Sequence, residues 1–494
     1  MEEVLIGWAE ESLVPSKKIS LAGQFYERIS EYVESEITAT AMSIQNGKER
    51  AIIISCDLTA VNGELIKSVR EKFAKMTDEI DPKYIIVGAT HTHTSHKYSS
   101  GLEKNASILS EFMKEGKGKN YSKLVETDES VLSPTEAFEF LSDRIALAAK
   151  KAWDNRKEAM YANAFGRAAV GFCRRVCYND GSAQMWGDTN TATFTALEGG
   201  NDSGIELLYI YNANKKLTGI VANIACPSQI LEHRSFISAD YWGEAKKILR
   251  KKFGEDIYLL AMCGAGGDQS PRDLVRWVEP ETPINDPNIS RPNVIDRVAD
   301  PSMFDLSGCR LAGKRVANEI ISVYEEITEI KSDIPFEHKA LVFDLPLRKV
   351  TIGDYKTAVC EIEYYVDKNK DKDNFNFKDI ATMHVYAGTI ARYRQQQTQE
   401  IVPTEVHILR LGDIAIATNP FELFLDYGNY IKARSSAKQT FIMQLTCGSL
   451  GYLPTEKAEK GGHYSAYVSS GNVGHEGGDM LARRSVTEIN KMFG

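Results

Sequence analysis

The segment from residue 51 to residue 90 decides the fold, because it contains a strand, a helix and a second strand in direct succession. "AIIISCDLTAV" (Ala51–Val61) is an apolar, β-branched run typical of a buried strand. "GELIKSVREKFAKM" (Gly63–Met76) repeats its apolar residues every three or four positions, as an amphipathic helix does. "KYIIVGAT" (Lys83–Thr90) again has the character of a strand. This order is typical of an α/β protein with a partly parallel sheet.

Further strands are predicted along the chain, and in its second half they more often follow one another without a helix between them. We therefore predict an α/β fold with a mixed sheet sandwiched with helices. The predicted strands are "LLYIYNA" (207–213), "LTGIVANIA" (217–225), "DIYLLAMCG" (256–264), "VHILRLGDIAIATN" (406–419) and "TFIMQLTCG" (440–448).

Composition and charge narrow the class of protein. The 494 residues are 43% hydrophobic and 26% charged, as in an ordinary globular protein. The net charge of −9 comes without a block of Lys or Arg, so no nucleic-acid or anionic-membrane partner is expected. No run of about 18 apolar residues occurs, so no transmembrane segment is predicted. The acidic start and eight scattered cysteines favour a cytoplasmic protein with reduced thiols. A small-molecule substrate is the expected partner, and a homo-oligomer is compatible with the sequence.

Two polar stretches interrupt the pattern. Residues 102–130, "LEKNASILSEFMKEGKGKNYSKLVETDES", are charged and weakly periodic, and they suit either a lid over a site or a surface excursion. "DKNKDKDNFNFKD" (367–379) is interpreted as a solvated loop. No repeat of fixed period is visible. We expect a single domain over residues 1–494 with one charged insert at about 102–130.

Polar residues gather where the predicted strands end, which is where α/β sheets carry functional groups. "IIVGATHTHTSHKYSSG" (Ile85–Gly101) holds three of the nine histidines. His91 and His93 are two positions apart, so on extended backbone both point to the same face. Such a pair can bind a metal or transfer a proton. A hydrogen-bonded histidine pair near the surface remains the alternative.

Two later strand ends carry further candidates. In "CGAGGDQSPR" (263–272), glycines allow close backbone approach to a ligand, and Ser270 before Pro271 is a candidate exposed nucleophile. A structural turn remains the alternative, since no glycine follows two residues after the serine as in GxSxG. In "NPFELF", Pro420 is predicted in the first turn of a helix together with Glu422, whose carboxylate complements the helix dipole or enters the site.

Together these motifs resemble the catalytic domain of the neutral/alkaline, non-lysosomal ceramidases and their bacterial relatives. The family's "THTHSGPGG" is similar to "THTHTSH" (90–96), and its "GDVSPN" is similar to "GDQSPR" (267–272). "GFCRRV" (171–176) resembles the family's "NR" motif, and "NPFELF" (419–424) resembles its "PGEF". Tyrosines twelve residues apart, at 452 and 464, resemble a pair of site tyrosines. The resemblance spans nearly the whole chain, from "IGWAEESLVP" to "GGHY".

The resemblance implies a zinc-dependent amidohydrolase that cleaves the N-acyl bond of ceramide to give sphingosine and a fatty acid. It implies that zinc is the cofactor and that Ser270 is the nucleophile, assisted by His93. Arg174 and Tyr464 are implied to stabilise the oxyanion. The implied metal ligands are His91, Cys226, Glu422 and Tyr452.

The sequence departs from the family at the second zinc histidine. Counting back fourteen residues from Asp240 reaches Cys226, a suitable zinc ligand, while His233 is an alternative. Asp57, Asp240 and Asp268 are further candidates for holding ligands in place. No counterpart of the ceramidase C-terminal immunoglobulin-like domain is recognised.

Three functions therefore remain open. The first is a zinc hydrolase that cleaves an N-acyl amide, as the resemblance implies. The second is a zinc hydrolase acting on a soluble polar substrate through another amide, an ester or a glycoside-like bond. The third is a degenerate metal-binding protein without activity.

Overall fold

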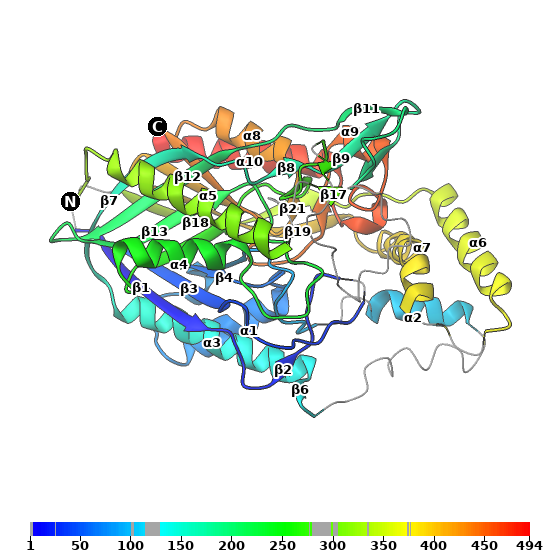
Figure 1. The fold of residues 1–494 in the computed structure, drawn as a ribbon, viewed down its shortest axis with the longest axis horizontal. Coiled ribbons are helices and arrows are strands. Elements are labelled where there is room, and N and C mark those ends of the chain that lie inside the picture. Colours follow the sequence, from blue (N-terminus) through cyan, green and yellow to red (C-terminus); the bar gives the residue numbers. More distant parts are fainter. Residues whose placement is uncertain are drawn as a thin grey trace.

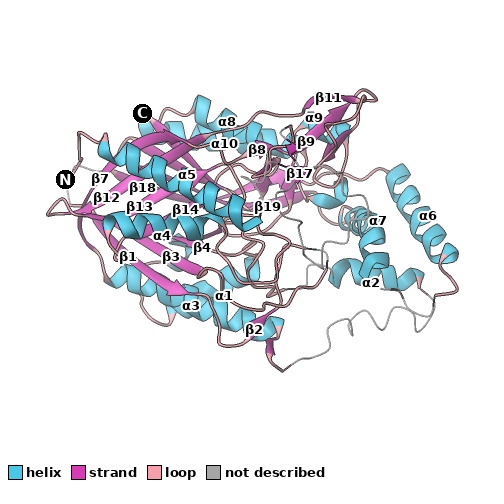
Figure 2. Ribbon diagram, viewed as in Figure 1, coloured by secondary structure: helices cyan, strands magenta, loops and turns pink. Residues whose placement is uncertain are grey.

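Two β-sheets stacked face to face form the centre of the fold, and helices cover both outer faces (Figure 1, Figure 2). The computed structural model describes residues 3–24, 26–99, 103–113, 129–275, 277–278, 298–299, 305–332, 335–372, 375 and 377–494. The larger sheet has eight strands in the order β14-β13-β12-β7-β1-β3-β4-β5. The smaller sheet has four, in the order β18-β19-β20-β22. Both sheets mix parallel and antiparallel pairs, as predicted.

The strands of the two central sheets are β1 (Leu5–Ser12), β3 (Thr38–Asn46), β4 (Glu49–Cys56), β5 (Ile85–Ala89), β7 (Lys157–Arg167), β12 (Gly204–Asn212), β13 (Leu217–Ile224), β14 (Tyr258–Cys263), β18 (Phe336–Pro346), β19 (Ile401–Leu411), β20 (Ile414–Thr418) and β22 (Gln439–Met443). Short strands form small separate ladders: β2 (Lys18–Ile19), β6 (Val131–Leu132), β8 (Phe172–Cys173), β9 (Arg175–Tyr178), β10 (Ala183–Met185), β11 (Phe194–Leu197), β15 (Gln269–Ser270), β16 (Trp277–Val278), β17 (Val298–Ala299), β21 (Glu422–Leu423) and β23 (Tyr452–Leu453).

The helices form the two outer layers and one peripheral group. Helices α1, α3, α4 and α5 cover the larger sheet, and α8 and α10 cover the smaller one. Their bounds are α1 (Gly63–Ala74), α2 (Glu103–Phe112), α3 (Pro134–Asp154), α4 (Tyr241–Phe253), α5 (Asp305–Glu325), α6 (Ile352–Lys368), α7 (Phe377–Gln395), α8 (Leu425–Arg434), α9 (Glu456–Gly461) and α10 (His475–Phe493), with short 3-10 turns at Pro82–Tyr84 and Val468–Ser470. Within the described part of the chain, no helix has the length and apolar character needed to cross a bilayer.

The alternation of side chains along the strands explains the layered core. On β4, Ile52 and Ile54 face helices α1 and α3, whereas Ile53 faces the smaller sheet. On the smaller sheet, Ile416 packs between the sheets and Ala417 packs beneath the outer helices. A strand buried on both faces needs apolar residues at every position, which is why these runs look continuously hydrophobic in the sequence.

The structure corrects one prediction about the polar stretches and shows a helix in the other stretch. The charge run at 367–379 is not a plain loop, because its first two residues end α6 and its last three begin α7. The insert at 102–130 contains α2, whose Ile108 and Leu109 pack against Ile362 and Met383 of α6 and α7. Residues 114–128 of that insert lie outside the described residues. These three helices gather at the end of the molecule opposite the chain termini (Figure 1).

Candidate functional site

Parallel strand pairs bring the ends of distant segments to one edge of the stacked sheets. Strand β5 runs parallel to β4, β13 parallel to β14, and β20 parallel to β22, so the loops after each pair leave the sheet at the same edge. Backbone hydrogen bonds from Ser228 to Thr90 and from Gln444 to Cys263 join these loops. The segments that follow β5, β13, β14 and β20 carry most of the candidate site residues.

His91 is held in a strained and defined orientation at this edge. Strand β5 ends at Ala89, and His91 has a φ of 67°, in the left-handed region that non-glycine residues seldom adopt. The expected extended backbone is therefore wrong at this position. Its Nδ1 lies 2.5 Å from the carbonyl oxygen of Thr59 and donates to it. Burial lowers the pKa of His91 to about 3, so the ring is neutral and its Nε2 carries a lone pair.

Glu422 approaches this lone pair from another part of the chain. Its Oε2 lies 3.5 Å from His91 Nε2 and 4.0 Å from the Arg174 guanidinium. Burial raises the pKa of the Glu422 carboxyl, although Arg174 opposes that shift. The predicted helical turn is wrong here: Glu422 lies on β21, which pairs in parallel with β23 and places Tyr452 directly beside it. Helix α8 begins only at Leu425.

His93 contacts His91 directly, as expected for this pair of histidines. Its Nε2 lies 3.3 Å from His91 Nε2, and the two rings are 4.8 Å apart, edge to face. The proximity expected from the HxH spacing is therefore present, although the backbone that produces it is not extended. The other ring nitrogen of His93, Nδ1, lies 3.4 Å from Glu232 Oε2. The third histidine of the cluster, His96, instead contacts the carbonyl oxygen of Leu13 in the core.

Arg174 ties the glycine-rich segment to the carboxylate. It is 2% exposed, and its Nη2 donates to the carbonyl oxygen of Gly267 at 2.9 Å. Gly267 has no room for a side chain, because a Cβ there would lie 2.3 Å from the carbonyl oxygen of Glu422. Gln444 accepts from the backbone N–H groups of Gly266 and Leu423 and so joins the same two segments. The glycines therefore serve close packing beside the site.

Ser270 is buried, and the expectation of an exposed nucleophile is wrong. It lies on β15, opposite Phe172 of β8, and its Oγ accepts from the backbone N–H of Arg272 at 2.9 Å. The neighbouring Asp268 accepts from the backbone N–H of Leu425, and burial raises the pKa of its carboxyl to about 6. Asp268 thus fixes the serine segment to the start of α8.

Tyr452 and Tyr464 lie together, and both are electrostatic neighbours of Arg174. Their rings are 6.0 Å apart, edge to face. The indole of Trp186 donates to the Tyr464 hydroxyl at 3.1 Å, and the Arg174 guanidinium lies over the Trp186 ring at 5.5 Å. Burial raises the pKa of the Tyr452 hydroxyl well above its usual range.

The remaining predicted residues do not join this group. Cys226 Sγ contacts the carbonyl oxygens of Val170 and Pro227, and it does not lie within 4.8 Å of ligand atoms of both His91 and Glu422. His233 Nε2 instead lies 3.9 Å from Asp305. Asp57 accepts hydrogen bonds from Thr38, Thr90 and Lys246. Asp240 accepts from the backbone N–H groups of Leu231 and Tyr241.

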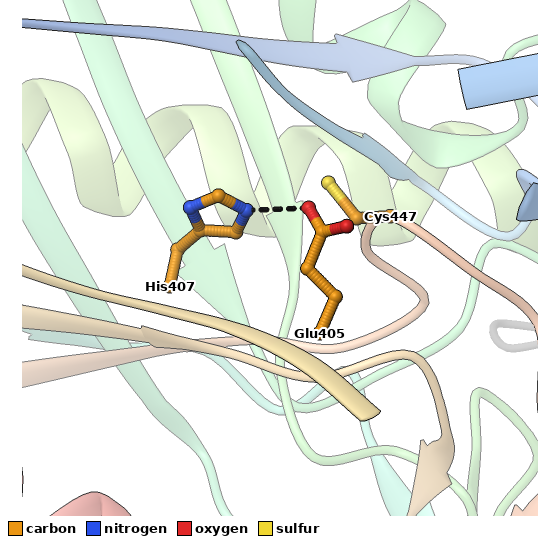
Figure 3. Close-up of side chains that lie close together, drawn as sticks. All are labelled: Glu405, His407 and Cys447. Atoms are coloured by element: carbon orange, nitrogen blue, oxygen red, sulfur yellow. Dashed lines mark hydrogen bonds and ion pairs between the residues drawn. The ribbon is translucent and has the colours of Figure 1, made fainter. Parts of the chain in front are cut away.

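A second polar cluster lies between β19 and the segment after β22 (Figure 3). In the described parts of the chain, Glu405, His407 and Cys447 form the one group of three His, Cys, Asp or Glu side chains whose ligand atoms all lie within 4.8 Å. Glu405 Oε1 lies 2.8 Å from His407 Nε2. Glu405 and Cys447 also line a surface pocket of about 330 Å³.

Arg70 changes the chemistry of this second cluster. Its guanidinium contacts Glu405 Oε1 at 2.5 Å and Oε2 at 3.1 Å, and it lies 3.7 Å from Cys447 Sγ. Burial raises the pKa of the Cys447 thiol to about 12, which keeps it protonated. A cation therefore already occupies the space between the would-be ligands. The cluster fits a structural ion pair better than a metal site.

Glu405→Gln tests this ion pair. Burial alone would raise the pKa of Glu405, but hydrogen bonds from His407 and Arg70 outweigh it and lower the pKa to about 2, from 4.5. The stabilisation is therefore present above pH 4.5 and is lost as the pH falls toward 2. We expect the variant to lose about 1–3 kcal/mol of unfolding free energy at pH 7. Denaturant unfolding should show this difference shrinking below pH 4.5, and an equal difference at pH 3 would contradict it.

The stacked sheets and their helical layers form a fold that is similar to that of solved neutral ceramidases. A structure described as ceramidase complexed with C2 superposes with a TM-score of 0.66 at 12% identity, covering 100% of this chain and 76% of that one. Neutral ceramidase from Pseudomonas aeruginosa gives a TM-score of 0.63 at 13% identity, covering 98% and 74%. No protein-family model and no curated protein matches the sequence. The resemblance inferred from the motifs is thus confirmed at the level of the fold.

The sequence did not predict several residues of the site and of the second cluster. Glu232 lies one position before His233, but a lone glutamate in a loop carries no local signal. Thr59 contributes only its backbone carbonyl, which no residue type reveals. Glu405 and His407 are two apart on a strand, so their shared face was predictable, whereas their contact with Cys447 was not.

Proposed function

We propose that this protein is a zinc-dependent hydrolase that cleaves an N-acyl amide bond. The proposal rests on the groups that surround His91 Nε2. This neutral nitrogen has a lone pair, fixed by the Thr59 carbonyl, and it faces the Glu422 carboxylate at 3.5 Å and a second imidazole at 3.3 Å. Acceptors that converge in a buried place require a cation or a proton between them.

The donor set fits zinc. Imidazole nitrogen and carboxylate oxygen are its usual ligands in catalytic sites, and a hydrogen bond from the other imidazole nitrogen to a carbonyl is the usual support. His91, Glu422 and Tyr452 would hold the ion. When bound, zinc would supply a positive charge that polarises a carbonyl and favours deprotonation of the Tyr452 hydroxyl.

The chain's own residues would carry out acyl transfer. Ser270 Oγ forms a bond to the carbonyl carbon of the substrate while its proton passes to His93. The C–N bond then breaks, and the amine leaves with that proton. Arg174 and Tyr464 stabilise the negative charge that develops on the carbonyl oxygen. Water finally hydrolyses the acyl-serine, releasing the carboxylic acid and restoring Ser270.

The decisive experiment joins metal analysis to a substrate panel. We expect about one zinc per chain and hydrolysis of at least one N-acyl compound. The panel contains a ceramide analogue, N-acyl amino acids, N-acyl sugars and matched esters. Turnover of soluble amides but not of the lipid would place the substrate among polar small molecules. Full activity in metal-free protein, or no turnover of any compound by zinc-loaded protein, would contradict the proposal.

A further inference from the structure

A buried carboxylate that the proposed reaction does not use lies against the proposed proton acceptor. Glu232 follows β13 in the turn before α4, and its side chain is 13% exposed. Its Oε2 lies 3.4 Å from His93 Nδ1, and its Oε1 lies 3.6 Å from the Arg272 guanidinium. Both neighbours belong to segments that already carry candidate catalytic residues.

The backbone around this contact is fixed by a second buried side chain. Arg28 is 2% exposed, and its guanidinium donates to the carbonyl oxygens of His93 and Arg234, both at 2.7 Å. These two carbonyls flank the contact on the two loops that meet there. Asp240 holds the second loop from its other side by accepting from the backbone N–H of Leu231, the residue next to Glu232.

The His93 ring is also restrained on its other face. Gly23 has a φ of +95°, and a Cβ at this position would lie 2.4 Å from His93 Cγ. The loop backbone therefore packs directly on the imidazole. With one face of the ring covered by Gly23 and Nδ1 directed at Glu232, Nε2 is the nitrogen that points into the site, 3.3 Å from His91 Nε2.

We infer that Glu232 is a positioning residue for His93 in the proposed hydrolysis. Through its contact with Nδ1 it fixes the orientation of the ring and favours the tautomer that carries the proton on Nδ1, so that Nε2 faces the site as the proposed acceptor of the Ser270 proton. Its second oxygen, through Arg272, links this histidine to the segment that carries the nucleophile. Arg272 N–H donates to Ser270 Oγ, so one carboxylate orients both partners of the proton transfer.

Glu232→Gln tests this inference, which rests on the proposed function. The change keeps the size of the side chain and removes its charge. We expect kcat on the best N-acyl substrate to fall about 10²- to 10⁴-fold, while KM, zinc content and thermal stability remain close to those of the wild type. The matched control is Glu405→Gln, which removes a carboxylate between a histidine and an arginine outside the site. It should keep the wild-type kcat.

A second measurement does not depend on turnover. The ¹⁵N spectrum of the nine imidazoles, assigned with His93→Gln, reports which ring nitrogen of His93 carries the proton. We expect the Nδ1–H form in the wild type and its loss in Glu232→Leu. A wild-type kcat in Glu232→Gln, or an unchanged His93 spectrum in Glu232→Leu, would overturn the inference and leave the hydrolase proposal standing. If no substrate is cleaved, the proposed function fails, and the spectrum alone decides the role of Glu232.

Discussion

Ser270→Ala is expected to abolish hydrolysis while leaving the folded, zinc-loaded protein intact. Removing the serine of an acyl-transfer site costs about 10⁴- to 10⁶-fold in kcat, because the nucleophile and its base act as a unit. The Oγ of Ser270 accepts one hydrogen bond, from the Arg272 backbone, so little stability is lost with it. The measurement is kcat at saturating substrate together with the thermal midpoint.

The matched control for this prediction is Ser485→Ala. Ser485 is 2% exposed, like Ser270 a buried serine, but it lies on α10, which covers the outer face of the smaller sheet. It should retain full activity. Residual turnover in Ser270→Ala close to that of Ser485→Ala would mean that water attacks directly and that no acyl-serine forms.

His91→Ala is expected to remove the metal. Its Nε2 is the atom on which the acceptors converge, and its loss leaves Glu422 and Tyr452 without the imidazole ligand. Loss of a residue that only supports a ligand costs about 10- to 100-fold in metal affinity, so loss of the ligand itself should cost more. Competition with a chelator of known affinity measures the change, and activity should fall in parallel.

Three further variants test where the proposed zinc ion is held. Cys226→Ser and His233→Gln should keep the wild-type zinc affinity. Cys226 Sγ contacts backbone carbonyl oxygens, and His233 Nε2 lies 3.9 Å from Asp305. His407→Gln should also keep this affinity, because Arg70 occupies the second cluster. Loss of zinc from Cys226→Ser would show that the Cys226 thiolate is a further ligand. Loss of zinc from His407→Gln would show that the metal binds at the second cluster, drawn in Figure 3.

The elements of this fold were largely predictable because their signals are local. The helix expected over Gly63–Met76 is α1, and the run at 406–419 is the pair β19 and β20 joined by a turn at Gly412. Errors arose where tertiary pairing overrides local preference. "NPFELF" has the pattern of a helix start, yet Glu422 becomes a strand residue because it pairs with Tyr452.

The sequence by itself determined which residue types stand at the ends of the strands, since the period of the apolar residues marks each strand and its boundary. Only the tertiary structure decided where those side chains point. Cys226 turns toward Val170, while Glu232, six residues later, turns toward His93. The physical reason is that these directions are set by contacts between segments far apart in the chain, which no local pattern encodes. One example is Arg28, which donates to the carbonyl oxygens of His93 and Arg234 on two different loops.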